Sequence, residues 1–125
     1  MKITLLSVAM FCLLISSVSF AETTPDQLAT EGKVMYAEGR YAAAVEVLEE
    51  AVAARPTFGL ATYYLALSYI RTGETDQAVA LLSTYLERVK QPNVQLTQLD
   101  KGYIPKNKEL LTYAKTEIQD FKNNQ

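Results

Sequence analysis

The sequence contains no histidine, and its one cysteine, Cys12, lies close to the N-terminus. Most enzymes that use a nucleophile with a partnering base need one of these two residues. Glycine-rich phosphate loops and Asp-x-Asp-x-Asp calcium loops are also missing from the sequence. Neighbouring acids such as Glu49 and Glu50 are expected to be solubilising surface charge. The sequence therefore predicts no catalytic residue, no metal site and no cofactor, and leaves a carboxylate-only hydrolase as the remaining catalytic alternative.

A large excess of one charge is also missing. The chain has 12 lysines and arginines against 14 acids, for a net charge of −2. This balance gives no electrostatic reason to expect nucleic acid as a partner. Hydrophobic residues make up 49% of the 125 residues, which favours one folded domain over disorder.

The first 21 residues differ in composition from the rest. A single positive residue, Lys2, precedes an uncharged and mostly apolar run over residues 3–20. Ser19 and Ala21 then place small residues where a leader peptidase requires them. Residues 1–21 are therefore predicted to be a cleaved signal peptide, which would leave no stable membrane span. The alternative is an uncleaved anchor, because the run approaches the length that crosses a bilayer.

Export would leave the mature chain without a disulfide. Cys12 falls inside the predicted leader, and the large residues Met10 and Phe11 before it argue against lipid attachment. A small exported domain without cysteine must be stabilised by packing alone. This composition fits the bacterial periplasm, which is the predicted location.

After the leader, the sequence repeats with a period of 34 residues. Small residues fall on small residues, and large apolar residues fall on large apolar ones. The matched pairs include Gly32 with Ala66, Gly39 with Gly73, Ala44 with Ala78, and Leu48 with Leu82. The small positions are expected to lie where helices cross closely.

Each repeat is predicted to form a helix, a tight turn and a second helix. Thr24, Pro25 and Gln27 provide a capped start, and Gly39 provides the left-handed residue that ends the first helix. Pro56 and Pro92 prevent the second helix of each repeat from continuing. The predicted helices cover residues 25–38, 41–54, 58–72 and 75–89.

The segment from Gly39 through Tyr41, Ala44 and Leu48 to Pro56 resembles the tetratricopeptide repeat. The run that begins at Tyr63 and continues through Gly73 and Ala78 resembles it as well. Over residues 25–92 the resemblance implies an all-α, short, right-handed superhelical array of helix-turn-helix repeats. Its two units would cover residues 25–58 and 59–92 within a region 22–92. Departures include Glu31 in place of the usual leucine and Thr75 in place of an aromatic residue.

Residues 93–125 match the repeat poorly. They are expected to form a polar connector over 93–103 and an apolar-striped helix over 105–122. Val94, Leu96 and Leu99 suggest a short helix that begins a degenerate third unit. Because a repeat array has an open apolar face at each end, the last helix is predicted to cap the second unit. If it does not, the chain would form homo-oligomers.

The resemblance also implies a groove lined by the first helix of each unit, which holds an extended or helical peptide of another protein. The implied first wall includes Ala29 and Ala37, which are small. The implied peptide-binding residues are Lys33, Tyr36, Leu60, Tyr63, Tyr64, Leu67, Ile70 and Arg71. The alternative for Tyr63, Tyr64 and Leu67 is core packing against the C-terminal segment. Some family members hold the terminal carboxylate of a chaperone peptide with several lysines, asparagines and arginines in the groove. Only Lys33 matches these residues here, so a co-chaperone role is not expected.

These patterns together predict a non-catalytic protein–protein interaction module of the cell envelope, acting as an adaptor, a subunit or an assembly factor. The alternative is a structural protein that assembles with itself through the open repeat faces.

Overall fold

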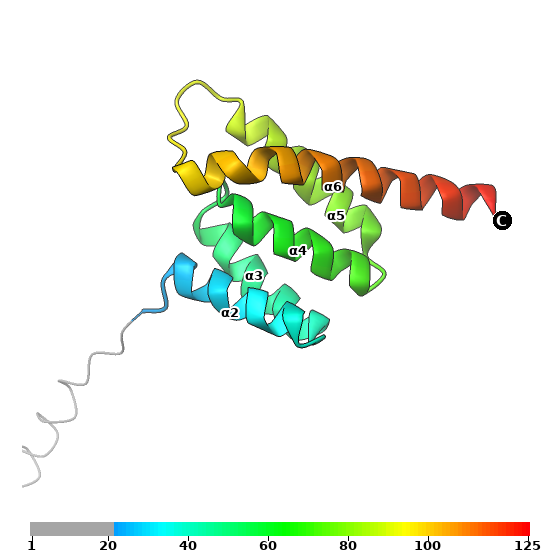
Figure 1. Ribbon diagram of the computed structural model, residues 1–125, viewed down its shortest axis with the longest axis horizontal. Coiled ribbons are helices and arrows are strands. Elements are labelled where there is room, and N and C mark those ends of the chain that lie inside the picture. Colours follow the sequence, from blue (N-terminus) through cyan, green and yellow to red (C-terminus); the bar gives the residue numbers. More distant parts are fainter. Residues whose placement is uncertain (1–21) are drawn as a thin grey trace, which may run out of the picture.

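The computed structural model describes residues 22–125, and the predicted signal peptide lies outside this part (Figure 1). All the regular structure in residues 22–125 is α-helical, and none of these helices is long and apolar enough to cross a membrane. The helices are α2 (Pro25–Ala37), α3 (Tyr41–Ala54), α4 (Gly59–Arg71), α5 (Thr75–Val89) and α6 (Gln98–Asn123).

The start of α2 is fixed by a capping box. The Thr24 hydroxyl accepts a hydrogen bond from the Gln27 backbone at 3.2 Å, and the Gln27 side chain accepts one from the Thr24 backbone at 2.9 Å. Pro25 occupies the first helical position, where it has no hydrogen-bond partner to lose. Sequence alone predicts this start, because all three residue types are typical of it.

The two repeats end their first helices in the same way. Gly39 and Gly73 have φ angles of 77° and 82°, in the left-handed region that glycine adopts without strain. The amide that follows each glycine donates to the carbonyl five residues before it, at 2.9 Å after Gly39 and 2.7 Å after Gly73. This bond closes a Schellman motif and turns the chain back into α3 or α5.

The small residues of the repeat lie at the helix crossings, as the sequence predicts. Ala44, Ala66 and Ala78 are completely buried. A Cβ added to Gly32 would collide with the side chain of Leu48, so α2 and α3 can approach this closely only at a glycine. Larger apolar side chains such as Leu48 and Leu82 fill the space around these crossings.

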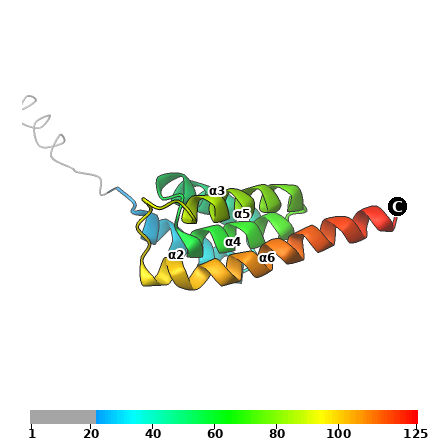
Figure 2. The same ribbon diagram turned by 90° about the horizontal axis from the view of Figure 1, so that it is seen from above.

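The helices form two layers. α4 contacts both α2 and α6, and these three helices form an inner layer. α3 and α5 form an outer layer and do not contact each other within the described chain. Figure 2 shows α3 and α5 along one side of the molecule and α6 along the other. The first helices of the repeats therefore share one face with α6.

The structure corrects the predicted C-terminal third. α6 begins at Gln98, not at Pro105, and Val94 and Leu96 lie in the non-helical segment before it. Thr97 and Asp100 form a second capping box that starts the helix early. Pro105 lies inside α6 on an exposed position, where water can solvate the backbone carbonyl that it leaves without a donor.

The helix α6 both caps the second repeat and extends the inner layer. It packs against both α4 and α5, the place expected of a helix that covers the second repeat. It also runs alongside α4 as the third helix of the inner layer, and its C-terminal end projects beyond the other helices (Figure 1). Phe121, near that end, is 67% exposed.

Candidate functional site

Five tyrosines lie ring to ring across the inner layer. Their order is Tyr41, Tyr36, Tyr64, Tyr63 and Tyr103, from α3, α2, α4, α4 and α6, and we call them the tyrosine row. Adjacent ring centroids are 5.3, 5.7, 5.4 and 5.7 Å apart, with tilted or edge-to-face geometry. Such pairs add favourable electrostatics to the packing. All five side chains remain partly exposed, so the row presents aromatic surface and hydroxyl groups to a ligand.

Three cations lie over rings of the row. Lys33 is 5.7 Å from the centroid of Tyr64, Arg71 is 5.4 Å from that of Tyr41, and Lys106 is 4.8 Å from that of Tyr103. Cation–π attraction at such distances holds long, flexible side chains near the ring faces. None of the three forms an ion pair with another residue of the described chain.

The hydroxyl groups of Tyr63 and Tyr64 stay neutral at physiological pH. Burial raises the pKa values of Tyr63 and Tyr64, and neighbouring tyrosines raise them further. A hydrogen bond with Tyr36 raises the pKa of the Arg71 guanidinium, which therefore stays charged. The face can donate hydrogen bonds from neutral hydroxyls and from fixed positive charges, and its hydroxyls can also accept them.

α6 extends this face and leaves the row open. A hollow of about 370 Å³ lies between α4 and α6, lined by Tyr63, Lys106, Glu109, Leu110 and Tyr113. Tyr103 of α6 contacts Tyr63 from the side, and both rings remain partly exposed. The C-terminal helix thus packs beside α4 and supplies a third wall.

The structure brings five of the eight predicted groove residues together at the tyrosine row. These are Lys33, Tyr36, Tyr63, Tyr64 and Arg71. Leu60 and Leu67 do not join the row. Both are partly buried and pack against the hydrophobic core. Ile70 instead lines a separate hollow with Phe121 near the end of α6.

One residue of the first predicted wall cannot contact a ligand. Ala29 is 1% exposed and belongs to the core, because its position on α2 faces the other helices. Ala37, the last residue of α2, is exposed.

Sequence reasoning missed three members of the face. Tyr103 fell in the predicted connector, and Lys106 was not among the predicted groove residues. The helical spacing of Tyr103, Lys106, Leu110 and Tyr113 could have revealed that α6 presents one continuous face. Tyr41 was not among the predicted groove residues either, and its partly buried ring lies at the end of the row.

A single arginine sets the register of the three inner helices. Arg55, at the end of α3, donates from its Nη2 to both carboxylate oxygens of Asp100 in α6, at 3.1 and 3.0 Å. It also pairs with Asp26 of α2 at 3.6 Å, and its guanidinium lies 4.1 Å from the ring centre of Phe58, which precedes α4. The N-terminal ends of α2, α4 and α6 therefore meet at one side chain, which aligns Tyr103 with Tyr63.

The Asp100 carboxylate is the most enclosed part of this arrangement, at 1% exposure. Burial alone would raise its pKa, but hydrogen bonds from Thr97, Arg55 and the Gly59 backbone outweigh burial and hold the pKa below its usual value. Asp100 falls in register with Gly32 and Ala66, where the repeat has a small residue. The structure shows that this charge is fully partnered.

Gly59 lets α6 come close to α4. A Cβ at this position would lie 2.6 Å from the Cβ of Tyr103 and 2.8 Å from the Tyr85 hydroxyl. The buried Asn107 side chain donates to the Gly59 carbonyl at 3.2 Å, which adds a second polar contact between the helices. Close packing at a glycine is thus what places the third wall next to the second.

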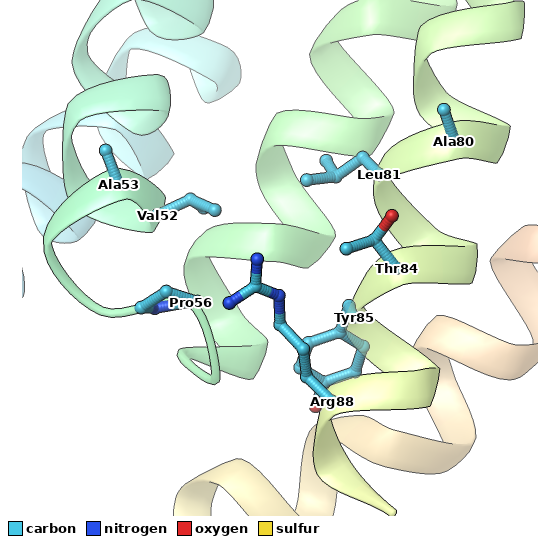
Figure 3. Close-up of a pocket in the computed structure, with 8 residues that line it drawn as sticks. All are labelled: Val52, Ala53, Pro56, Ala80, Leu81, Thr84, Tyr85 and Arg88. Atoms are coloured by element: carbon cyan, nitrogen blue, oxygen red, sulfur yellow. The ribbon is translucent and has the colours of Figure 1, made fainter.

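The outer layer has a hollow of its own, of about 440 Å³. Figure 3 shows Val52 and Leu81 on facing helices α3 and α5, with the Arg88 guanidinium extending into the gap towards Pro56. This outer hollow lies on the opposite layer from the tyrosine row. The titratable residues in its lining are Arg88 and Tyr85. Its lining offers small apolar contacts and few polar ones.

The chain was compared with known protein families, curated proteins and solved structures. A model of the tetratricopeptide repeat matches residues 35–99, a little over half of the sequence. The chain belongs to the tetratricopeptide repeat family. No curated protein and no solved structure matched it in the same comparisons.

Membership of the tetratricopeptide repeat family agrees with the helix-turn-helix architecture of α2 to α5. Tetratricopeptide repeats generally mediate protein–protein interaction, and the family is typically non-catalytic. The match ends at Leu99, inside the first turn of α6, so the family pattern reaches the third inner helix.

Proposed function

We propose that this tetratricopeptide repeat protein is a non-catalytic adaptor, subunit or assembly factor that holds a segment of another protein on its inner face. The tyrosine row carries the proposal, because it joins four helices in one partly exposed aromatic surface. Tyrosine and arginine are the residues that contribute most at protein interfaces, since they bury large area and keep polar ends.

A pull-down with the double variant Tyr63→Ala/Tyr64→Ala tests this function. Recovery of partner proteins is expected to fall more than about tenfold, because removing central interface side chains commonly costs more than 1.4 kcal/mol. The matched control is Leu81→Ala/Thr84→Ala on the outer layer, which should recover partners as the wild type does. Equal recovery by both variants, with unchanged melting curves, would contradict the proposal.

The cell envelope is the proposed location, supported by the residues before Glu22. The charged start, the uncharged run and the small residues Ser19 and Ala21 are typical of a cleaved leader. Protein isolated from the periplasm is expected to have an intact mass that begins at Glu22. A mass that includes Met1 would show that the leader is retained.

Self-assembly is a second candidate function, and the exposed end of α6 favours it. Ile118 and Phe121 of α6 line a hollow of about 630 Å³ together with Ile70 and Gly73 at the α4–α5 turn, and Phe121 is 67% exposed. An open apolar helix face of this kind can bind a second copy of the chain.

Light scattering over a dilution series tests self-assembly. Under this candidate the chain is expected to be dimeric or larger at high concentration, and Phe121→Glu should make it monomeric by placing a charge in the apolar contact. The matched control Gln119→Glu adds the same charge at a separate exposed position on α6. A wild type that stays monomeric at high concentration would exclude this candidate.

A further inference from the structure

We infer that the segment bound on the inner face is extended and acidic, and that its side-chain carboxylates pair with Lys33, Arg71 and Lys106. This inference rests on the proposed function and adds the chemistry of the partner. It follows from the charges along the row, from the partners that these charges lack, and from the length of the row.

The charge on the face is opposite to the charge of the whole chain. The chain has a net charge of −2, yet three cations lie over rings of the tyrosine row. Two acids lie near the row: Glu109, which acts on Tyr63, and Glu117, which accepts a hydrogen bond from the Tyr113 hydroxyl at 2.7 Å. A partner with carboxylates would complement this positive face, and a basic partner would be repelled.

The three cations are available to a ligand. Arg55 and Lys90, in contrast, form ion pairs with acids of this chain. Lys33, Arg71 and Lys106 contact tyrosine rings and no carboxylate within residues 22–125. Their ring contacts hold them in place before binding, which reduces the entropy lost when a carboxylate pairs with them.

The spacing of the cations favours side-chain carboxylates over a terminal one. Arg71 lies at the Tyr41 end of the row, Lys33 at the central Tyr64, and Lys106 at the Tyr103 end. The four ring-to-ring steps give the row a length of at most about 22 Å, which about six or seven residues of extended chain cover. Charges spread over such a length match several acidic residues along a segment.

The tyrosines complete the match to an extended chain. The neutral hydroxyls of Tyr63 and Tyr64 can donate to backbone carbonyls of the segment, and the ring faces of the row can pack against its apolar side chains. The bound segment therefore combines acidic residues with apolar ones.

Selection from a display library tests the inference on the full chain. Random peptides about a dozen residues long are selected for binding, and the enriched peptides are synthesised with a fluorescent label. Peptides enriched in aspartate and glutamate are expected, and their affinity should fall as salt is raised. The variant Lys33→Gln/Lys106→Gln should weaken them about tenfold or more, which corresponds to about 1.4 kcal/mol.

A matched control uses two other lysines of the same chain. Lys108 and Lys115 are exposed residues of α6. Lys108 follows Lys106 by two residues, and Lys115 follows Tyr113 by two residues. A step of two residues turns about 200° around a helix, so both lysines point away from the row. The variant Lys108→Gln/Lys115→Gln makes the same charge change away from the row and should leave peptide affinity unchanged.

The outcomes separate this inference from the proposed function. Enriched peptides that are neutral or basic, and that still require Tyr63, would overturn the acidic partner and retain peptide binding on this face. Acidic peptides that lose affinity equally in both lysine variants would also overturn the inference, because general charge attraction would then explain binding. Enrichment of no peptide that requires Tyr63 would overturn both proposals.

Discussion

Replacing Asp100 with alanine is expected to lower the free energy of unfolding by about 3–5 kcal/mol, the usual cost of breaking a buried ion pair. The variant loses both hydrogen bonds from Arg55 Nη2, the acceptor of the Gly59 amide and half of the capping box with Thr97. Each lost partner is near the start of α6, so this helix should separate first. Urea unfolding followed by circular dichroism measures the loss.

The control for Asp100→Ala is Asp26→Ala, which removes the other acid that pairs with Arg55. The Asp26 side chain is 74% exposed, so water replaces most of its interaction. A loss of less than about 1 kcal/mol is expected from this variant. Similar losses from both variants would show that burial of Asp100 does not matter.

The lowered pKa of Asp100 predicts that the free energy of unfolding depends on pH. Because its folded-state pKa lies below the usual value, Asp100 contributes stability that is fully present above the unfolded-state pKa. That contribution is lost as the pH falls through the folded-state pKa. The stability difference between wild type and Asp100→Asn should therefore shrink in acid, which unfolding curves at several pH values would reveal.

The second large effect is expected from Gly59→Leu. Even the Cβ of the new side chain would lie 2.6 Å from the Cβ of Tyr103, an atom that can move only if the α6 backbone moves. Overpacking of this kind commonly costs about 1–3 kcal/mol, and a leucine adds three further carbons. We expect α6 to separate from α4, with the third wall lost and the two repeats still folded.

Hydrogen exchange resolved along the chain measures this separation. Amides of α6 should exchange faster in Gly59→Leu, while those of α2 and α3 change little. The control is Gly102→Ala, since no atom lies within 4 Å of the added Cβ and the residue is inside an exposed helix. That change should stabilise the chain by up to about 1 kcal/mol through helix propensity. Uniformly faster exchange in Gly59→Leu would contradict local separation.

Much of the fold follows from the sequence because local signals agree with the repeat. Gly39 and Gly73 each end a helix, and Thr24 with Pro25 starts one, through contacts within a few residues. The early start of α6 was missed because Pro105 was read as a first-turn residue. The stronger signal was the capping box of Thr97 and Asp100.

The candidate site was predicted less completely, since its members come from helices that only tertiary packing brings together. The resemblance to the tetratricopeptide repeat implied that Tyr36, Tyr63 and Tyr64 share one face, but it did not show that Tyr41 and Tyr103 join them. Those contacts depend on the register between α6 and α4, which Arg55 and Gly59 set. Long-range polar contacts of this kind leave no periodic trace in the sequence.

The position of Arg55 also bears on how the chain unfolds. In a linear repeat array, each unit contacts only its neighbours, and the ends can fray independently. Here the guanidinium touches Asp26 near the first residue of the array and Asp100 at the start of its last helix. Because Asp100 is buried and Asp26 is exposed, this link holds the last helix more firmly than the first, so fraying of this short solenoid should begin at α2 and not at α6.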